Sequence, residues 1–369
     1  MKKKNIMTLH PDVDTILKMN EPYIPRPEDY ERADEHEKEG FITKAKSVSY
    51  WADAWRRLKK NKVAMIALCV IIFLVLFAFV GPAFTGYSYS MQMRGEENWP
   101  PVWEKPQESV LRKAETDGVT FDPWKHVLGT DNLGRDNLTR LMYGTRISLC
   151  IGIAATLIVV VIGSIVGSIA GYAGGAVDVI IMRVTEIIYS IPDVLIILLL
   201  STAIKANLTE YINSHTGWWP EFLNTMGGNL VGIFITFGLI YWVSMSRIIR
   251  GQVLMLKQQE YVTAARALGA SSSRIIRRHL LPNCIGQLVV TACLQIPSAI
   301  FLESFLSFLG MGVSAPLTSL GSMASDGLSG IYTYPYRLIV PAIVLSVLIL
   351  SFNLFGDGLR DALDPRLKK

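Results

Sequence analysis

The sequence predicts an all-α polytopic membrane protein with six transmembrane helices. Half of the 369 residues are hydrophobic and only 18% are charged, and the apolar residues gather in long runs, unlike those of a soluble domain. Each run reaches the ~20 residues that a helix needs to cross a ~30 Å hydrocarbon layer. The predicted spans are about 63–84, 147–172, 184–205, 229–248, 284–310 and 336–356.

The first 50 residues are polar and do not read as a secretory signal peptide. They contain Pro22, Pro25 and Pro27 followed by the charge run EDYERADEHEKEG, which predicts a flexible cytoplasmic extension over residues 1–50. The first apolar run is then expected to act as its own insertion signal.

Residues 51–84 are predicted to form an interfacial helix followed by the first span. Trp51, Trp55 and Leu58 fall on one helical face. The cations around that face are Arg56, Arg57, Lys59, Lys60 and Lys62. Aromatic rings at the headgroup level and cations on anionic lipid are typical of membrane surfaces, so we expect membrane lipid, and no nucleic acid, as the partner here.

The distribution of lysine and arginine predicts the orientation of the chain. With the N-terminus inside, 26 of the 36 cations lie on the cytoplasmic side, as the positive-inside rule requires. Both termini are then cytoplasmic in a multi-pass protein of the cell (inner) membrane. Residues 85–146 form an extracytoplasmic loop, 258–283 a cytoplasmic loop within the 147–356 core, and 357–369 a cytoplasmic tail.

The extracytoplasmic loop contains the stretch GTDNLGRDNLTRLMYGTRISL at 129–149. Asp131 is a candidate helix cap, and Leu133, Leu138, Leu141 and Met142 supply a partial apolar face. The pattern predicts an amphipathic connector that ends at the second span.

The cytoplasmic loop is the strongest candidate site for a protein partner. Tyr261, Ala264, Ala265 and Leu268 form a narrow apolar helical stripe that Gly269 should end. Serines at 271–273 offer an N-cap for a second, basic helix, which Pro282 should close. The basic residues of this second helix include Arg274, Arg277 and Arg278. The pattern predicts a docking element; the alternative is an amphipathic loop that lies on the membrane face.

Within the spans, Glu303 is the one acid deep in an apolar run. Burying a carboxylate there costs roughly 3 kcal/mol, so it must face protein or water. It either lines a water-filled path or contacts a partner subunit, or it is held between helices by protonation or hydrogen bonds. Gly163, Gly167 and Gly171 are spaced four apart and predict close packing of the second span.

No enzymatic site is visible in the sequence. There is no G-x-x-x-x-G-K-[ST] phosphate loop, so this chain is not expected to hydrolyse ATP. No catalytic residues and no metal ligands are predicted, because the five histidines and four cysteines are scattered without ligand spacing.

The 258–283 loop resembles the conserved cytoplasmic loop of ATP-binding-cassette (ABC) importer permeases. Ala264, Ala265, Gly269, Leu281 and Pro282 stand in register with the family pattern, whereas Thr263 and His279 depart from it. The resemblance implies that this loop couples to an ATPase. The residues expected to carry the coupling are Glu260, Tyr261, Ala264, Ala265, Leu268, Gly269, Arg274, Arg277, Arg278, Leu281 and Pro282.

A second motif resembles the signature that precedes the second span in C-type permeases of oligopeptide, dipeptide and nickel importers. Its residues are Gly129, Thr130, Asp131, Gly134, Arg135 and Asp136. With ESFLSFLGMG, the SDG at 325–327 and the tail, the resemblance covers roughly residues 50 to 369.

The resemblance implies a type I ABC importer permease fold with cytoplasmic coupling helices. It also implies a heterodimer with a second permease, two cytoplasmic ABC ATPase subunits and an extracytoplasmic peptide-binding protein. No cofactor is expected in this chain, because ATP and Mg are used by the partner subunits. Oligopeptides are the expected substrate, and dipeptides or nickel are the alternatives within the family. A secondary transporter and a non-transporting membrane scaffold are the alternatives from other classes.

Overall fold

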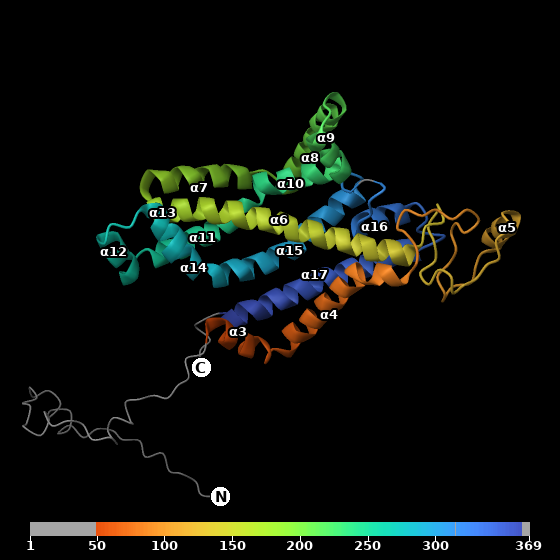
Figure 1. Ribbon diagram of the computed structural model, residues 1–369, viewed down its shortest axis with the longest axis horizontal. Coiled ribbons are helices and arrows are strands. Elements are labelled where there is room, and N and C mark those ends of the chain that lie inside the picture. The colour runs from red at the N-terminus through yellow and green to blue at the C-terminus, as the bar shows by residue number, and fades with distance from the viewer. Residues whose placement is uncertain (1–48, 314, 364–369) are drawn as a thin grey trace, which may run out of the picture. The chain divides into compact units, whose positions relative to one another are not determined.

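The computed structural model describes residues 49–313 and 315–363, and this part of the chain is built from helices (Figure 1). Six of its helices are long and apolar enough to cross a membrane. The predicted all-α fold with six spans is therefore confirmed. The predicted N-terminal extension lies outside the described residues as far as residue 48, and the tail lies outside them from residue 364.

The chain enters the bundle through α3 (Tyr50–Leu58) and α4 (Lys62–Phe79), and a short 3₁₀ helix, η2 (Gly81–Phe84), follows. The Asn61 side chain caps α4 by accepting a hydrogen bond from the Ala64 amide at 3.2 Å. The first span is therefore shorter than predicted. It ends at Phe79 because the chain tightens at Gly81 and Pro82, which has no N–H to donate.

The second span is the longest helix, α6 (Asn137–Ala173), and it begins ten residues before the predicted start. The predicted amphipathic connector is thus the first part of α6 itself. Asp136 caps this helix by accepting from the Thr139 amide at 2.7 Å, so the expectation that Asp131 caps a helix was wrong. Polar residues such as Arg140 are tolerated here because they are buried against other parts of the chain.

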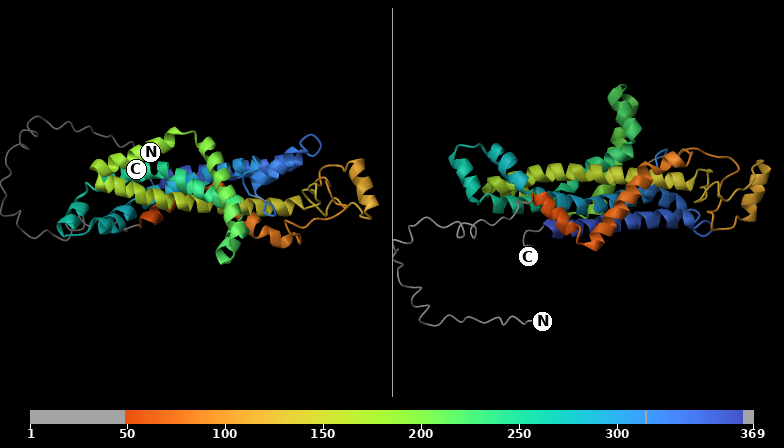
Figure 2. Two further views of the ribbon diagram at one scale, coloured as in Figure 1. Left: turned by 90° about the horizontal axis from the view of Figure 1, so that it is seen from above. Right: turned by 60° about the horizontal axis from the view of Figure 1, so that its bottom comes forward.

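The predicted third span, 184–205, crosses a break in the structure. Helix α7 (Gly175–Ser190) ends before Pro192, and α8 (Asp193–Ser214) begins after it. Proline disfavours helical backbone in the preceding residue, and Ile191 is extended. The helix that satisfies the requirements of a span is Val194–Ser214. In Figures 1 and 2, α8 and α9 (Trp218–Met226) leave the direction of α6.

The fourth span consists of α10 (Gly228–Ile240) and α11 (Trp242–Leu256), with a break at Tyr241. The fifth is α15 (Ile285–Phe308), close to its predicted bounds. The sixth is α17 (Tyr336–Leu363), which continues seven residues beyond its predicted end.

Short helices between the spans include α5 (Glu108–Thr116) after α4 and α16 (Leu320–Leu328) before α17. Helix α6 runs beside α11 and α15 (Figures 1 and 2). An added Cβ at Gly163, Gly167 or Gly171 would collide with α11, and at Gly167 it would overlap the Ser246 carbonyl oxygen. The predicted close packing of these glycines is confirmed, and their small size fixes how near the two backbones approach.

Candidate functional site

The 258–283 loop folds as α12 (Glu260–Ala267), α13 (Ser272–Ile275), the π-helix η3 (Ile276–Leu280) and α14 (Leu281–Asn283). Gly269 has a φ of +79°, as expected of a glycine that ends a helix. The backbone of Ser271 occupies the N-cap position of α13, but its side chain makes no capping hydrogen bond.

The expectation that Pro282 closes the basic helix was wrong. Pro282 lies in the first turn of α14, and the chain continues through Cys284 into α15. Proline is tolerated in a first helical turn because its missing N–H has no partner inside the helix. The loop is thereby joined to the fifth span without an extended connection.

Three apolar side chains anchor the loop to the bundle. Val262, Ile275 and Leu280 are fully buried in the same cluster as Ile249 and Val253 of α11. None of these anchors was among the residues predicted to carry the coupling. The anchors bind the loop to the fourth span, so a force on the loop reaches the span.

The predicted apolar stripe faces mostly away from this anchor. Leu268 is 89% exposed and Tyr261 38% exposed. Ala264 is also exposed, whereas Ala265 is half-buried. An exposed leucine beside small residues is a surface that a partner can cover with little loss of side-chain entropy.

Beside this face lies a group of cations. Arg274, Arg277 and Arg278 are exposed and form no ion pair with another described residue. Glu260 is exposed in the first turn of α12, where a carboxylate is favourable to the helix dipole. Leu281 is half-buried and Pro282 exposed at the other end of the loop.

The two arms of the loop are joined to each other. The Asn283 side-chain amide donates to the His279 carbonyl at 2.6 Å and to the Tyr261 hydroxyl at 3.4 Å. The Tyr261 and His279 rings lie 6.5 Å apart between centroids. These contacts make α12 and α14 one unit with an apolar and a basic surface.

An ion pair clamps the neighbouring helix ends. Arg250 of α11 donates two hydrogen bonds to Asp178 of α7, at 2.5 and 2.6 Å. Hydrogen bonding from Arg250, together with its charge and that of Lys257, lowers the pKa of the Asp178 carboxyl. Lys257 also donates to the Gly171 carbonyl at 2.9 Å, near the end of α6. Three helices therefore meet where the chain enters the loop.

The GTDNLGRD signature builds a second ordered site at the start of α6. Asp131 is buried and accepts from the Arg135 side chain at 2.6 Å and from Arg140 at 2.5 Å. Arg140 also donates to Asp326 of α16 at 2.9 Å. The signature therefore ties the α4–α6 loop to α16.

The glycines of the signature are required by space as well as by conformation. Gly129 and Gly134 both have positive φ values, and an added Cβ would overlap the carbonyl oxygen of Trp99 or of Met93. Thr130 accepts a hydrogen bond from the Trp99 amide at 2.9 Å. These contacts fold the preceding loop back onto the signature.

His126 is the buried centre of this region, and the sequence analysis had not singled it out. Its two ring nitrogens lie 2.8 Å from Glu96 and 2.8 Å from Asp136, the cap of α6. Lys125 pairs with Glu96 as well. The charged residues of the loop thus neutralise each other around a helix start.

Glu303 is fully buried inside the chain. Its carboxyl accepts from Ser148 of α6 at 2.9 Å, and from Ser304 and Ser307 of α15 at 3.3 and 2.7 Å. This geometry favours the alternative of a carboxyl hydrogen-bonded between helices. Its role in a path or a subunit contact stays a prediction.

Sequence comparison determines the family. The family described as "Binding-protein-dependent transport system inner membrane component" matches residues 160–369. The chain belongs to this family. The N-terminal transmembrane domain of oligopeptide transport permease C matches residues 49–101. Because the family consists of membrane permeases of ABC importers, this permease is not itself an enzyme.

Curated relatives match this permease over most of their length. It is 42% identical to the dipeptide transport system permease protein of Bacillus subtilis (strain 168), covering 91% of the permease and 92% of the relative. The oligopeptide transport system permease protein of the same organism is 41% identical, with 88% and 92% covered. The oligopeptide permease protein of Escherichia coli (strain K12) is 38% identical, with 86% and 92% covered.

Proposed function

We propose that this permease carries oligopeptides across the cell membrane as one of two permease subunits of an ATP-driven importer. A peptide-binding protein delivers the substrate to the end that holds the GTDNLGRD signature. Two ABC ATPases act at the opposite end, through the 258–283 loop. The observation that carries the proposal is the exposed face of Tyr261, Ala264 and Leu268 on a loop whose buried anchors join it to the fourth span.

The proposed orientation places this loop and both termini in the cytoplasm. The excess of lysine and arginine on that side supports the assignment. ATP and Mg are then used by the partner subunits, since the sequence contains no phosphate-binding loop of its own. Differential contacts of the two ATPase states with the loop are what bias the bundle between its conformations.

The mechanism is alternating access. Closure of the ATPases pushes on α12, and the buried anchor Val262 passes the displacement to α11. The clamp between Asp178 and Arg250 carries it onward to α7. Because packed cores switch between discrete arrangements, a small shift at the loop rocks whole spans.

Dipeptides are the second candidate substrate. Import of dipeptides is supported by the 42% identity to the dipeptide permease protein of Bacillus subtilis. The identity to the oligopeptide permease protein of the same organism is 41%.

The test is uptake of labelled di-, tri- and pentapeptides by cells with and without the gene. Loss of ATP-dependent tri- and pentapeptide uptake supports an oligopeptide importer, and loss of dipeptide uptake alone selects the second candidate. Uptake that survives ATP depletion but stops with an ionophore would indicate a secondary transporter. Unchanged uptake of every peptide contradicts the proposal.

A further inference from the structure

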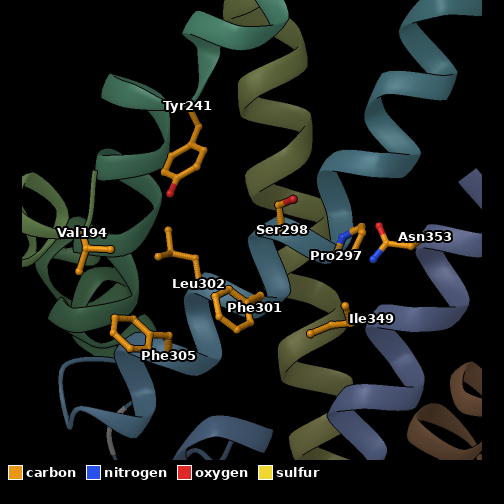
Figure 3. A pocket seen from close by; sticks show the side chains of 9 residues that line it. All are labelled: Val194, Tyr241, Pro297, Ser298, Phe301, Leu302, Phe305, Ile349 and Asn353. Carbon is orange, nitrogen blue, oxygen red and sulfur yellow. The ribbon is translucent and has the colours of Figure 1, made fainter. Parts of the chain in front are cut away.

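A cavity of about 590 Å³ lies among the spans (Figure 3). Its walls come from α8, the α10–α11 break, α15 and α17. The lining residues are Val194, Tyr241, Pro297, Ser298, Phe301, Leu302, Phe305, Ile349 and Asn353. This volume is within the ~300–1,000 Å³ range of ligand pockets in proteins.

The cavity lies at the middle of three spans. Tyr241 is near the centre of Gly228–Leu256, Pro297 and Ser298 are near the centre of Ile285–Phe308, and Ile349 is near the centre of Tyr336–Leu363. Val194 is the first residue of the span Val194–Ser214, so the cavity joins the beginning of one span to the middle of three others.

Breaks in three helices meet at this cavity. Tyr241 separates α10 from α11, Pro297 interrupts the hydrogen-bond pattern of α15, and Val194 follows the break at Pro192. Proline at 297 leaves the Cys293 carbonyl without its usual i+4 donor. Irregular backbone at membrane depth is tolerated where it is buried in protein or lines an aqueous cavity.

The polar side chains of the cavity are few and uncharged. The Ser298 hydroxyl and the Asn353 amide form no hydrogen bond with another described residue, and in Figure 3 the Asn353 amide points toward Pro297. Asn353 is half-buried and Ser298 is exposed, so both groups are open to a ligand or to water that enters the cavity. The aromatic rings of Phe301 and Phe305 line the same space, and Phe301 is 59% exposed at its open side.

We infer that this cavity is a binding station for the peptide main chain on its way through the permease. Asn353 offers a donor and an acceptor, as a peptide group requires, and Ser298 adds a hydroxyl. The phenylalanine rings cover the apolar side chains of the passing peptide. No lining residue is charged, so the station accepts peptides regardless of their side-chain charge. This inference rests on the proposed function and assigns the residues that contact the substrate.

The first test measures peptide uptake and ATP hydrolysis together, with the whole importer reconstituted in vesicles. Asn353→Leu keeps the size of the side chain and removes its hydrogen bonds. We expect peptide taken up per ATP hydrolysed to fall by about tenfold, since each lost hydrogen bond is worth roughly that factor. ATP hydrolysis stimulated by the loaded binding protein should persist, because Asn353 is remote from the 258–283 loop.

Phe301→Trp, which narrows the cavity, should have the same effect. The matched control is Phe73→Trp, an exposed position on α4 outside the cavity. Wild-type uptake per ATP in both Asn353→Leu and Phe301→Trp overturns the inference. A wild-type importer that moves no peptide at all instead contradicts the proposed function, so the two failures are distinguishable.

A second measurement follows the rate at which a cysteine in the cavity wall is modified. Ser298→Cys is made in a chain whose Cys69, Cys150 and partly buried Cys293 are replaced by serine, and the assembled importer is treated with a bulky thiol reagent. We expect uptake to stop, and transported peptide to slow the modification severalfold. The same serine-substituted chain with Ser298 intact is the control. The proposal is contradicted if peptide leaves the rate of modification unchanged, or if only the lipid composition changes that rate.

Discussion

Gly269 turns the chain between α12 and α13 with a φ of +79°. Nothing lies within 4 Å of an added Cβ there, so backbone conformation, and not space, is what requires glycine. We expect Gly269→Val to abolish peptide uptake, because a β-branched residue is strained at positive φ. Gly269→Asn should keep most of the uptake, since asparagine tolerates this conformation.

The measurement is uptake normalised to the amount of chain in the membrane. Gly251→Val is the control, because Gly251 lies in α11 without a positive φ and an added Cβ there also has open space. Normal transport by the Gly269→Val chain would refute a role for this turn in coupling. Equal loss in the Asn variant would show that the residue itself, and not its φ, matters.

Asp131 illustrates how a buried acid is held by several donors. It faces the side chains of Arg135 and Arg140, and both Asp131 and Arg140 are buried. Asp131→Asn removes the negative charge that faces the two arginines. Breaking such a buried pair costs about 3–5 kcal/mol. We expect a large drop in the thermal midpoint of the purified protein in detergent.

Asp117→Asn is the matched change at a pair whose cation is exposed. Its partner Arg94 is 88% exposed in its side chain, and such pairs contribute about 0–1 kcal/mol. Equal shifts for the two variants would mean that the GTDNLGRD signature does not stabilise the fold.

The ion pair of Asp178 and Arg250 joins α7 to α11, and it predicts a dependence on pH. The pKa of Asp178 is lowered from 3.8, first by hydrogen bonding from Arg250. The pair therefore stabilises the fold fully above this unfolded value, and its contribution is lost as the pH falls through the lower folded value. Asp178→Asn should reduce the unfolding midpoint by a constant amount from neutral pH down to about pH 4.

Below that pH the wild type and the Asp178→Asn variant should converge. The control is Arg250→Gln, which removes the same pair from the other side, combined with Asp178→Asn in a double-mutant cycle. A difference between wild type and variant that grows on acidification would have the wrong sign and would exclude this pair as the cause.

The helices differ in how far the sequence predicts them. Long apolar runs predict five of the spans because length and composition suffice. Pro192 indicates a kink, yet the apolar run passes through it, so the predicted span 184–205 includes residues on both sides of the break between α7 and α8. Neither proline nor glycine occupies position 241, so the sequence did not indicate the break there. The start of α6 was placed too late because buried ion pairs, which no periodicity reports, keep its polar first turns helical.

The candidate site was predictable only in part, because local preferences set its outline and packing sets its orientation. The helix–glycine–helix outline of the 258–283 loop follows from local preferences, and it is confirmed at Gly269. The direction of the apolar stripe is a property of packing. Val262, Ile275 and Leu280 occupy the buried positions of the loop. Leu268 therefore faces outward. Contacts distant in sequence, such as Asp178 with Arg250, cannot be read from one chain.

Taken as a whole, the described bundle carries its exposed loop cations where the proposed ATPases bind. Arg274, Arg277 and Arg278 lie beside the exposed Leu268 and form no ion pair with another described residue. A partner that covers Leu268 must therefore present acidic groups around an apolar groove. Each exposed pair contributes about 0.2–1 kcal/mol, so replacing all three arginines by glutamine should weaken ATPase binding by roughly tenfold.

The measurement is the amount of ATPase that copurifies with the permease at increasing salt. Binding to the wild type should fall as salt rises, because exposed charges are screened, and the triple variant should lose most of that dependence. The control replaces Arg94, Arg112 and Lys113, three exposed cations of the α4–α6 loop, by glutamine. Since that loop lies at the opposite end of α6, its change should leave ATPase binding intact; a salt dependence equal in both variants would show that the arginines of the 258–283 loop do not face the ATPase.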